Sequence, residues 1–397
     1  MENNWDLKSL TDEFIGHYGG SKESISVFFA PGRVNLIGEH TDYNGGYVFP
    51  CSLHFGTYLL LRKIHYSTIT FKSKNAPMTA QVCSAKPITP VGNTWINYPL
   101  GVMNEFQKRG FNISGYNLLF AGNIPNSAGL SSSASIEMVT ALALNTLEKY
   151  GLNTIELVRL CQRAENEFVG MKCGIMDQFA VGMGKKEHAI FLNCFTLEYD
   201  LVPVKLGDFS LIITNTNKQR RLADSKYNER RAQCERAVSD LQPYKEIRNL
   251  SELSPYDLQQ ASHLIGSSTV RKRVKHVVTE NQRVLSAVDV LRKNDLVQFG
   301  RLMFESHQSL KEDYEVSCFE LDTLVEEAAK IPGVAGCRMT GAGFGGCTVS
   351  LVKTGLADRF ISTVGEIYKI KTGLDATFFK AEIGNGARQI RIGPRSN

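Results

Sequence analysis

The sequence lacks the features that would place it in a membrane or in an oxidising compartment. It has no uninterrupted apolar run of about 18 residues, and its start, MENNWDLKSL, does not join a basic segment to an apolar one. The nine cysteines are scattered, odd in number and contain no C-x-x-C pair, which argues against a disulfide framework or a zinc ribbon. These absences predict a cytoplasmic protein with no membrane partner.

Strong charge of one sign is also absent. The 397 residues carry 45 Lys and Arg against 40 Asp and Glu, a formal net charge of +5. This weak field is compatible with an anionic small substrate but gives no reason to expect nucleic acid. The basic segments RLADSKYNERR and TVRKRVKHVV have helix-spaced charges, which are typical of solvated faces and ion pairs. We therefore expect no nucleic-acid partner.

Long linkers and repeats are missing as well. At roughly 150 residues per domain, the 397 residues predict two domains, with three as the alternative. Short β-type runs at 26–30, 47–50, 57–62 and 68–72 predict a sheet in the first hundred residues. Helical spacing follows from Ser131 to Gly151, and a second helix is expected from Asn153, whose capping box closes at Glu156, to Gly170.

After residue 190, strands expected at 189–192, 211–214 and 348–352 alternate with polar helices at 225–242 and 267–291. Strands mixed with helices, without a regular βαβ rhythm, predict an α+β architecture. We expect two domains that share an interface, residues 1–205 and residues 206–397.

The first segment that suggests chemistry is APGRVNLIGEHTDYNGG, residues 30–46. Its dense hydrogen-bonding groups suit a neutral, polyhydroxylated ligand whose hydroxyls each need a partner. A polar surface turn is the alternative. Metal binding by Glu39, His40 and Asp42 is disfavoured because adjacent positions on a strand point in opposite directions.

The second segment is PNSAGLSSSAS, residues 125–135, which leads into the first helix. A Gly- and Ser-rich turn at a helix start offers backbone N–H groups and hydroxyls to phosphate oxygens. It matches neither G-x-x-x-x-G-K-[ST] nor G-x-G-x-x-G. The segment therefore predicts an anion site, with an ordinary serine-capped helix as the alternative.

Two acids and a glycine-rich segment complete the set. Glu165 borders the buried face of the second helix, so its carboxylate needs a partner: either a salt bridge with an arginine or Mg²⁺. Considered without the neighbouring segments, Glu165 favours the salt bridge. Asp177, in CGIMDQ, suits a base or a ligand anchor, and equally a helix N-cap. Residues 333–346 carry six glycines, which keep side chains away from a close neighbour or form a tight strand entry.

Taken in order, the segments GRVNLIGEHTDYNGG, GLSSSAS, AENEFVGMKCGIMDQF, SKYNERR and RMTGAGFGG resemble the signature motifs of the GHMP kinases, over at least residues 28–350. The first motif is most similar to that of the galactose-phosphorylating members. Asn126 and Ser127 depart from the pattern, since glycine is common there in relatives. The resemblance implies a two-domain fold of mixed and antiparallel sheets packed with helices, with the active site in the cleft between the domains.

The resemblance also implies a reaction, the ATP-dependent phosphorylation of the anomeric C1 hydroxyl of α-D-galactose, which gives galactose 1-phosphate and ADP. The implied sugar contacts are Arg33, Glu39, His40, Asp42, Gly174, Asp177 and Tyr227. The implied phosphate contacts are Gly129, Leu130, Ser131, Ser132, Ser133, Ala134 and Ser135. Trp95 and Tyr98 would lie beside adenine, Ser133 and Glu165 would bind Mg²⁺, and residues 341–346 would form the floor beneath the reacting groups.

Within this resemblance Arg33 and Asp177 are the catalytic pair. Asp177 would accept the proton of the attacking hydroxyl, and Arg33 would keep Asp177 ionised and stabilise charge on the transferred group. A kinase for N-acetylgalactosamine and a catalytically silent galactose and ATP sensor remain alternatives, although the serine run that such sensors tend to shorten is intact. The expected partners are galactose and ATP, and the expected state is a monomer.

Overall fold

The computed structural model describes residues 5–92, 94–125, 128–219 and 223–391. Its largest sheet has six strands in the order β13-β1-β3-β6-β4-β5. These strands are β1 (Ser26–Asn35), β3 (Pro50–Ile64), β4 (Thr68–Ser73), β5 (Ala80–Cys83), β6 (Gly115–Gly122) and β13 (Arg388–Ile390). The sheet is mixed, because β4 and β6 are parallel whereas the other neighbours are antiparallel.

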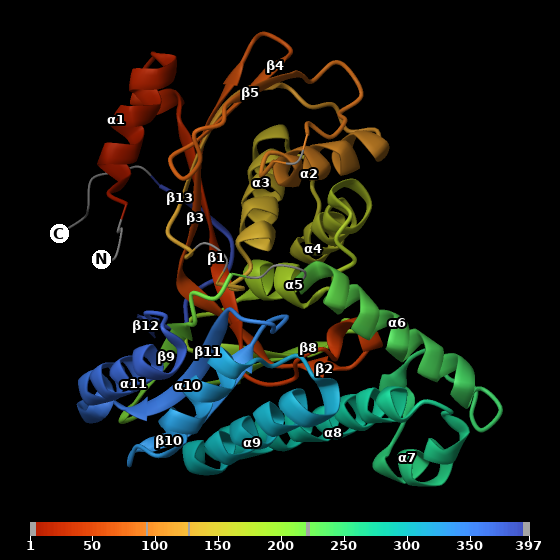
Figure 1. The fold of residues 1–397 in the computed structure, drawn as a ribbon. Helices are drawn as coiled ribbons and strands as arrows, with labels where there is room; N and C mark the ends of the chain where they lie inside the picture. The colour runs from red at the N-terminus through yellow and green to blue at the C-terminus, as the bar shows by residue number, and fades with distance from the viewer. Residues whose placement is uncertain (1–4, 93, 126–127, 220–222, 392–397) are drawn as a thin grey trace.

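Both faces of this sheet are covered by helices. Helix α1 (Leu7–Tyr18) covers one face, and α2 (Asn97–Lys108), α3 (Ser132–Glu148), α4 (Thr154–Arg163) and α5 (Met176–Met183) gather on the other (Figure 1). The alternation of strand side chains explains this arrangement: Leu60 packs in the cluster with α1, whereas Leu59 and Leu61 pack in the cluster with α3. The hydrophobic run in β3 is therefore buried on both sides.

A second sheet, in the order β10-β11-β9-β12, is antiparallel throughout. Its strands are β9 (Phe209–Asn215), β10 (Val334–Thr340), β11 (Cys347–Lys353) and β12 (Thr377–Ala381). Ile212 packs against α10 (Phe319–Ala329) and α11 (Ala357–Thr372), whereas Ile213 faces the cluster that contains α8 (Ser268–Arg292) and α9 (Leu296–Ser309). This sheet is thus a layer between two helical layers.

The remaining elements join these two parts. A three-stranded sheet is formed by β2 (Tyr47–Val48), β7 (His188–Asn193) and β8 (Tyr199–Pro203). Helices α6 (Ala223–Leu241) and α7 (Pro255–Ala261) lie with α8 on the far side of the molecule from α1 (Figure 1). The boundary predicted near residue 205 falls between β8 and β9 and stays a prediction, but the last strand, β13, returns to pair with β1.

The strands and helices predicted from hydrophobic periodicity are confirmed, with differences at their ends. The capping box of Asn153 and Glu156 is present at the start of α4. The helix predicted to run to Gly170 is α-helical only to Arg163, continues as a π-helical turn (Ala164–Val169), and ends at Gly170 in a left-handed conformation. Widening of the last turns changes the direction in which Glu165 points.

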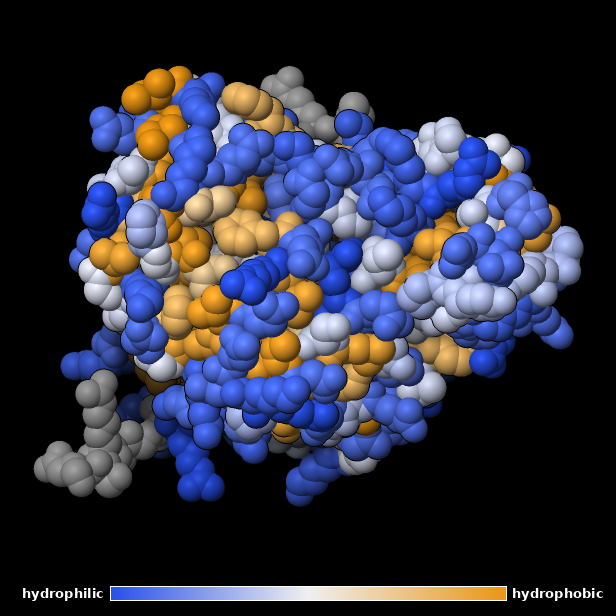
Figure 2. All heavy atoms as spheres, turned by 90° about the horizontal axis from the view of Figure 1, so that it is seen from below, coloured by the Kyte–Doolittle hydropathy of each residue, from blue (hydrophilic) through white to orange (hydrophobic). Residues whose placement is uncertain are grey.

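The surface shows no extended apolar face in the view from below, towards the side that α8 and α9 border in Figure 1. Hydrophobic residues there are interrupted by hydrophilic ones (Figure 2). Scattered surface hydrophobics of this kind are ordinary for a globular protein. No helix in the described part of the chain combines the length and apolar character needed to cross a membrane.

Candidate active site

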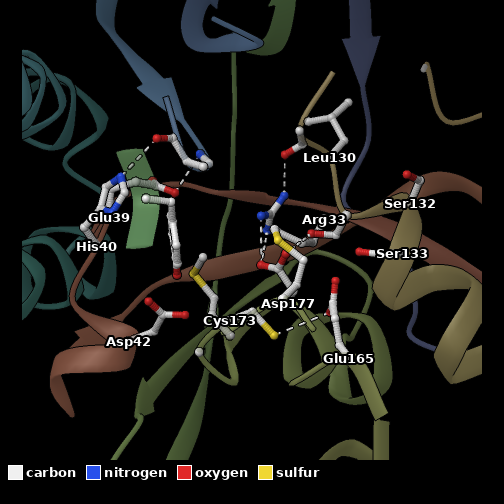
Figure 3. A pocket seen from close by; sticks show the side chains of 18 residues that line it. Arg33, Glu39, His40, Asp42, Leu130, Ser132, Ser133, Glu165, Cys173 and Asp177 are labelled. Carbon is white, nitrogen blue, oxygen red and sulfur yellow. Dashed lines mark hydrogen bonds and ion pairs between the residues drawn. The ribbon is translucent and has the colours of Figure 1, made fainter. Parts of the chain in front are cut away.

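A cavity of about 310 Å³ collects residues from every predicted motif. Its walls come from the end of β1 and the turn after it, the start of α3, the segment from Glu165 to Asp177, α6 and the glycine-rich loop after β10 (Figure 3). All seven residues expected to contact sugar line it: Arg33, Glu39, His40, Asp42, Gly174, Asp177 and Tyr227. The expected phosphate residues Gly129, Leu130, Ser131, Ser132 and Ser133 line it too.

Arg33 and Asp177 form an ion pair at the centre of this cavity. Arg33 Nη2 and Nε lie 2.8 and 2.9 Å from Asp177 Oδ1, and Arg33 Nη1 donates to the carbonyl of Gly129 at 2.7 Å. Ser131 Oγ donates to the other carboxylate oxygen, Oδ2, at 2.6 Å. These three donors occupy three of the roughly four acceptor positions of a carboxylate. Asp177 Oδ2 therefore keeps room for one further hydrogen-bond donor.

The backbone explains how β1 delivers Arg33 to the serine segment. The pairing of β1 with β3 shifts register between Pro31 and Arg33, and the Arg33 N–H donates to the carbonyl of Leu130. Gly32 permits this approach, because a Cβ atom there would lie 2.9 Å from the same carbonyl oxygen. The strand thus bulges towards the start of α3.

The capping alternatives for Ser131 and Asp177 are wrong. Ser131 occupies the N-cap position of α3 in a left-handed conformation, with φ of 59°, and its side chain bonds to Asp177 instead of capping the helix. The N-cap of α5 is Ile175, and Asp177 lies inside the first turn. Both side chains are directed to the cavity.

Glu165 lies in the π-helical turn and accepts a hydrogen bond from Gln178 Nε2 at 2.6 Å. The same Gln178 nitrogen donates to Glu137 at 3.1 Å. In the described part of the chain Glu165 makes no ion pair, so the expected salt bridge with an arginine is wrong. Burial, followed by the nearby negative charge of Asp177, raises the pKa of Glu165 to about 7.

This acidic environment fits a bound divalent cation. Burial and the neighbouring Glu165 also raise the pKa of Glu137 well above its usual range, and Ser133 hydrogen-bonds to Glu165. Within the described residues no group of three or more His, Cys, Asp or Glu side chains could hold a metal. Glu165 and Ser133 provide two oxygen atoms of the kind that Mg²⁺ binds, and phosphates and water commonly complete the coordination of this ion.

The turn after β1 holds the polar residues of the first motif. Strand β1 ends at Asn35, so Glu39, His40 and Asp42 are not on a strand, and the prediction that their side chains alternate is wrong. Glu39 is buried and is held by Arg338 Nη1 at 2.7 Å and by the N–H of Gly341 at 2.7 Å. Its pKa is raised because burial outweighs the attraction of Arg338.

Burial shifts the pKa values of His40 and Asp42 in opposite directions. Burial, assisted by the nearby His276, lowers the pKa of His40 to about 3. The imidazole is therefore neutral, with Nε2 donating to the carbonyl of Ala342 at 3.2 Å and Nδ1 accepting from the Tyr43 hydroxyl at 2.9 Å. Burial and the charge of Asp177 raise the pKa of Asp42 to about 7.

The glycine-rich loop after β10 closes the cavity from the opposite side. Gly341 has φ of 83°, and a Cβ atom there would lie 3.1 Å from the carbonyl oxygen of Gly129. The loop therefore approaches the serine segment backbone to backbone, as its glycine content predicted.

The predicted adenine residues lie in a second cavity, of about 340 Å³. Trp95 and Tyr98 line it together with Ser132 and Ser133, and these two serines also line the first cavity. The buried indole Nε1 of Trp95 has no hydrogen-bond partner among the described residues. The start of α3 therefore separates two spaces that one elongated ligand could occupy.

Two of the residues expected to contact phosphate do not line these cavities. Ala134 is part of the hydrophobic core, and the Ser135 hydroxyl is buried and donates to the carbonyl of Ala30. Asn126 and Ser127 lie outside the described residues. The side chains that the structure brings to the cavities are those of Ser131, Ser132 and Ser133.

Sequence reasoning missed Arg338, Gln178 and Glu137. Arg338 is fully buried in β10 and holds Glu39, and Gln178 bridges Glu137 and Glu165. A signal was present for each: a lone arginine in an apolar strand, an amide next to Asp177, and an acid within a helix that is otherwise apolar. Such buried polar groups need partners, and this requirement could have directed attention to them.

Three family models match the chain. They are described as "Galactokinase galactose-binding signature" over residues 12–63, "GHMP kinases N terminal domain" over 97–185 and "GHMP kinases C terminal" over 287–370. The galactokinase of Fusobacterium nucleatum is 52% identical over 391 residues, which cover 97% of this chain and 100% of the relative. The galactokinase of Bacillus subtilis is 49% identical and covers 94% and 96% respectively.

Solved structures agree. Lactococcus lactis galactokinase complexed with galactose has a TM-score of 0.94 and 43% identity, with 97% of this chain and 100% of that chain covered. A mevalonate kinase, at a TM-score of 0.65 and 18% identity, shares the fold. The expected two-domain α+β fold of mixed sheets and helices is confirmed. On this identity and coverage, the chain belongs to the galactokinase family of the GHMP kinases.

Proposed function

We propose that this protein transfers the γ-phosphoryl group of ATP to the anomeric C1 hydroxyl of α-D-galactose, giving galactose 1-phosphate and ADP. The observation that carries the proposal is the ion pair of Arg33 and Asp177 at 2.8 Å, with Ser131 beside it, in a cavity lined by residues of all five motif segments. Family membership supports the same reaction.

On the sugar side, the cavity offers both hydrogen-bond acceptors and donors. Asp42 and Asp177 provide carboxylate oxygens and Tyr227 a phenolic hydroxyl, while Gly174 leaves the backbone uncovered. Glu39 and His40 border the cavity with most of their polar atoms already bonded to the protein. We assign them mainly to shaping the sugar site.

Asp177 and Arg33 would divide the chemistry between them. Asp177 Oδ2 is the acceptor for the proton of the C1 hydroxyl as that oxygen forms its bond to the γ-phosphorus and the bond to the ADP oxygen breaks. Arg33 and Ser131 hold the carboxylate in one orientation. The guanidinium also places fixed positive charge next to the group in transfer, so little reorganisation is needed.

On the nucleotide side, Gly129, Leu130 and Ser131 to Ser133 are the proposed phosphate contacts, at a helix start whose first N–H groups favour anions. Trp95 and Tyr98 are the proposed adenine contacts, in the adjoining cavity. Mg²⁺, held by Glu165 and Ser133, would neutralise charge on the phosphate oxygens. Residues 341–346 would form the floor beneath the reacting groups, where Gly341 lets the backbone approach closely.

A sugar panel with ATP and Mg²⁺ tests the proposal. Galactose should release ADP and give a product phosphorylated at C1, identified by phosphorus NMR. Preferential turnover of N-acetylgalactosamine would assign the protein to that substrate instead. Binding of galactose and ATP without ADP release would make it a sensor and would contradict the enzyme proposal.

We further propose that the protein acts as a cytoplasmic monomer divided near residue 205. One chain supplies every residue of the first cavity, and all nine cysteines are free thiols. Sedimentation of the purified protein measures the oligomeric state, and a dimer mass at micromolar concentration would contradict this part.

A further inference from the structure

A third cavity, of about 520 Å³, lies behind the sugar side of the first. The two share Asp42, Cys173 and Gly174 as a common wall. The volume is within the range of small-molecule sites, about 300–1,000 Å³. None of the roles proposed above uses this space.

Arginine dominates the walls of this cavity. Arg159 and Arg163 come from α4, Arg231 from α6 and Arg248 from the segment before α7. Asp42 is the acidic residue among those lining the cavity. Four guanidinium groups and one carboxyl group thus line the cavity, so N–H donors that could bind an anion outnumber the carboxylate acceptors that would compete for them.

Helix α4 and the π-helical turn after it present several polar side chains to the cavity. Arg159, Gln162 and Arg163 of α4, at positions i, i+3 and i+4, line it together with Asn166 of the π-helical turn. The Arg159 side chain forms no hydrogen bond or ion pair with the other described residues. The amides of Gln162 and Asn166 add uncharged donors between the two arginines.

The other three guanidinium groups are held through their Nε atoms by glutamates that do not line the cavity. The Nε atoms of Arg163, Arg231 and Arg248 contact Glu105, Glu235 and Glu252 at 3.0, 3.0 and 3.2 Å respectively. In the described residues the terminal nitrogens of Arg163 and Arg248 have no polar partner. Anchoring through Nε leaves these terminal nitrogens available as a fork.

An aromatic ring fixes one of these groups further. The guanidinium carbon of Arg248 lies 4.3 Å from the centroid of the Phe195 ring, and Phe195 is itself 45% exposed. The contact is a cation–π interaction, which holds the planar group without consuming its N–H donors. Forked donors on preoriented arginines match the oxygens of a phosphate group.

We propose that this cavity is a second ligand site that binds a phosphate monoester or free phosphate. The recognising groups are Arg159, Arg163, Arg231 and Arg248. Phosphate binding here is independent of the proposed reaction. The identity of the natural ester, for which galactose 1-phosphate is the candidate, rests on that reaction.

The structure also supplies a connection to the sugar side. Arg231 Nη1 donates to the carbonyl of Lys172 at 3.0 Å, and Lys172 directly precedes the shared wall of Cys173 and Gly174. A phosphate group that engages Arg231 would change the restraint on this wall. Occupancy should therefore alter the affinity for galactose, and galactose should alter the affinity for phosphate by the same factor.

Calorimetric titration of the full chain tests the site. Inorganic phosphate and galactose 1-phosphate are titrated separately, with galactose and a non-hydrolysable ATP analogue saturating the first two cavities. The double variant Arg159→Ala/Arg248→Ala should weaken binding by at least about tenfold. Binding of inorganic phosphate identifies free phosphate as sufficient, whereas binding of the sugar ester alone identifies the ester.

The matched control is Arg236→Ala/Arg301→Ala. Both control arginines are on the surface, and Arg236 is on α6 but outside the cavity lining. Unfolding temperature and basal turnover of both double variants should equal those of the wild type. The proposal is overturned if neither ligand binds, or if both double variants bind as the wild type does. The test measures phosphate affinity and not turnover. It therefore supports or overturns the phosphate site even if galactose proves not to be the substrate.

Discussion

Replacing Asp177 by asparagine removes one charge and one proton acceptor while keeping the shape of the side chain. The asparagine Oδ1 can still accept from Arg33, whose nitrogens lie 2.8 and 2.9 Å away, and its amide nitrogen can donate to the Ser131 hydroxyl in place of the present 2.6 Å bond. The local structure should therefore survive. Loss of general base catalysis typically costs 10²–10⁴-fold, so kcat should fall by this factor, about 3 to 5 kcal/mol in activation free energy.

Galactose binding should suffer much less, because a single weakened hydrogen bond corresponds to about tenfold in Kd. Coupled-enzyme assay of ADP release gives kcat, and calorimetry gives the Kd for galactose. The control is Asp313→Asn, which disrupts a comparable ion pair with Lys275 at 2.9 Å, outside the cavity lining. A kcat for Asp177→Asn within about threefold of the wild type would refute the assignment of Asp177 as the proton acceptor.

Glu165→Gln should raise the Mg²⁺ concentration for half-maximal turnover by about tenfold, whereas Glu167→Gln, an exposed neighbour, should not; equal titrations would contradict the assigned ligand. Since the pKa of Glu165 is raised to about 7, protons compete with the metal below that pH, so the wild-type requirement should fall by about tenfold from pH 6 to pH 8. The phosphates of the nucleotide titrate in the same pH range, so the effect of Glu165 is measured as the difference between the pH profiles of the wild type and Glu165→Gln. Identical profiles would show that protonation of Glu165 does not cause the pH dependence of the Mg²⁺ requirement. Gly174→Ala should displace the Asp42 carboxylate, whose Oδ2 would lie 1.9 Å from the new Cβ, and raise the KM for galactose with the KM for ATP unchanged. Gly16→Ala, where nothing lies within 4 Å, is its control, and an unaltered galactose KM in Gly174→Ala would show that Asp42 does not contact the sugar.

The sequence predicted the elements of this fold well because their signals are local. Helical spacing and the Asn153 capping box identified α3 and α4, and β-type runs identified β1, β3 and β4. The return of β13 to β1 has no local signal, since it joins residues more than 300 positions apart. Pairings of that kind are decided by the packing of the whole chain.

The site divides in the same way. The pairing of Arg33 with Asp177 was predicted and is present. The hydrogen bond from Ser131 to Asp177 was not predicted, because Ser131 was equally suited to cap a helix. Its hydrogen bond to Asp177 depends on the left-handed backbone conformation of Ser131, which no sequence pattern predicted. The sequence left a salt bridge and Mg²⁺ as alternatives for Glu165. Its carboxylate contacts Gln178 and no arginine in the described chain, because the π-helical turn changes the direction in which the side chain points. Binding of Mg²⁺ stays a prediction.

The pairing of β13 with β1 makes the large sheet depend on a segment that is synthesised more than 300 residues after β1. Val27 to Phe29 find their edge partners only at Arg388 to Ile390. While the ribosome is still at work, the strand that carries Arg33 has an open edge, and open edges invite association between nascent chains. A fragment truncated before β13 would keep this edge of β1 open permanently, however complete its motifs are.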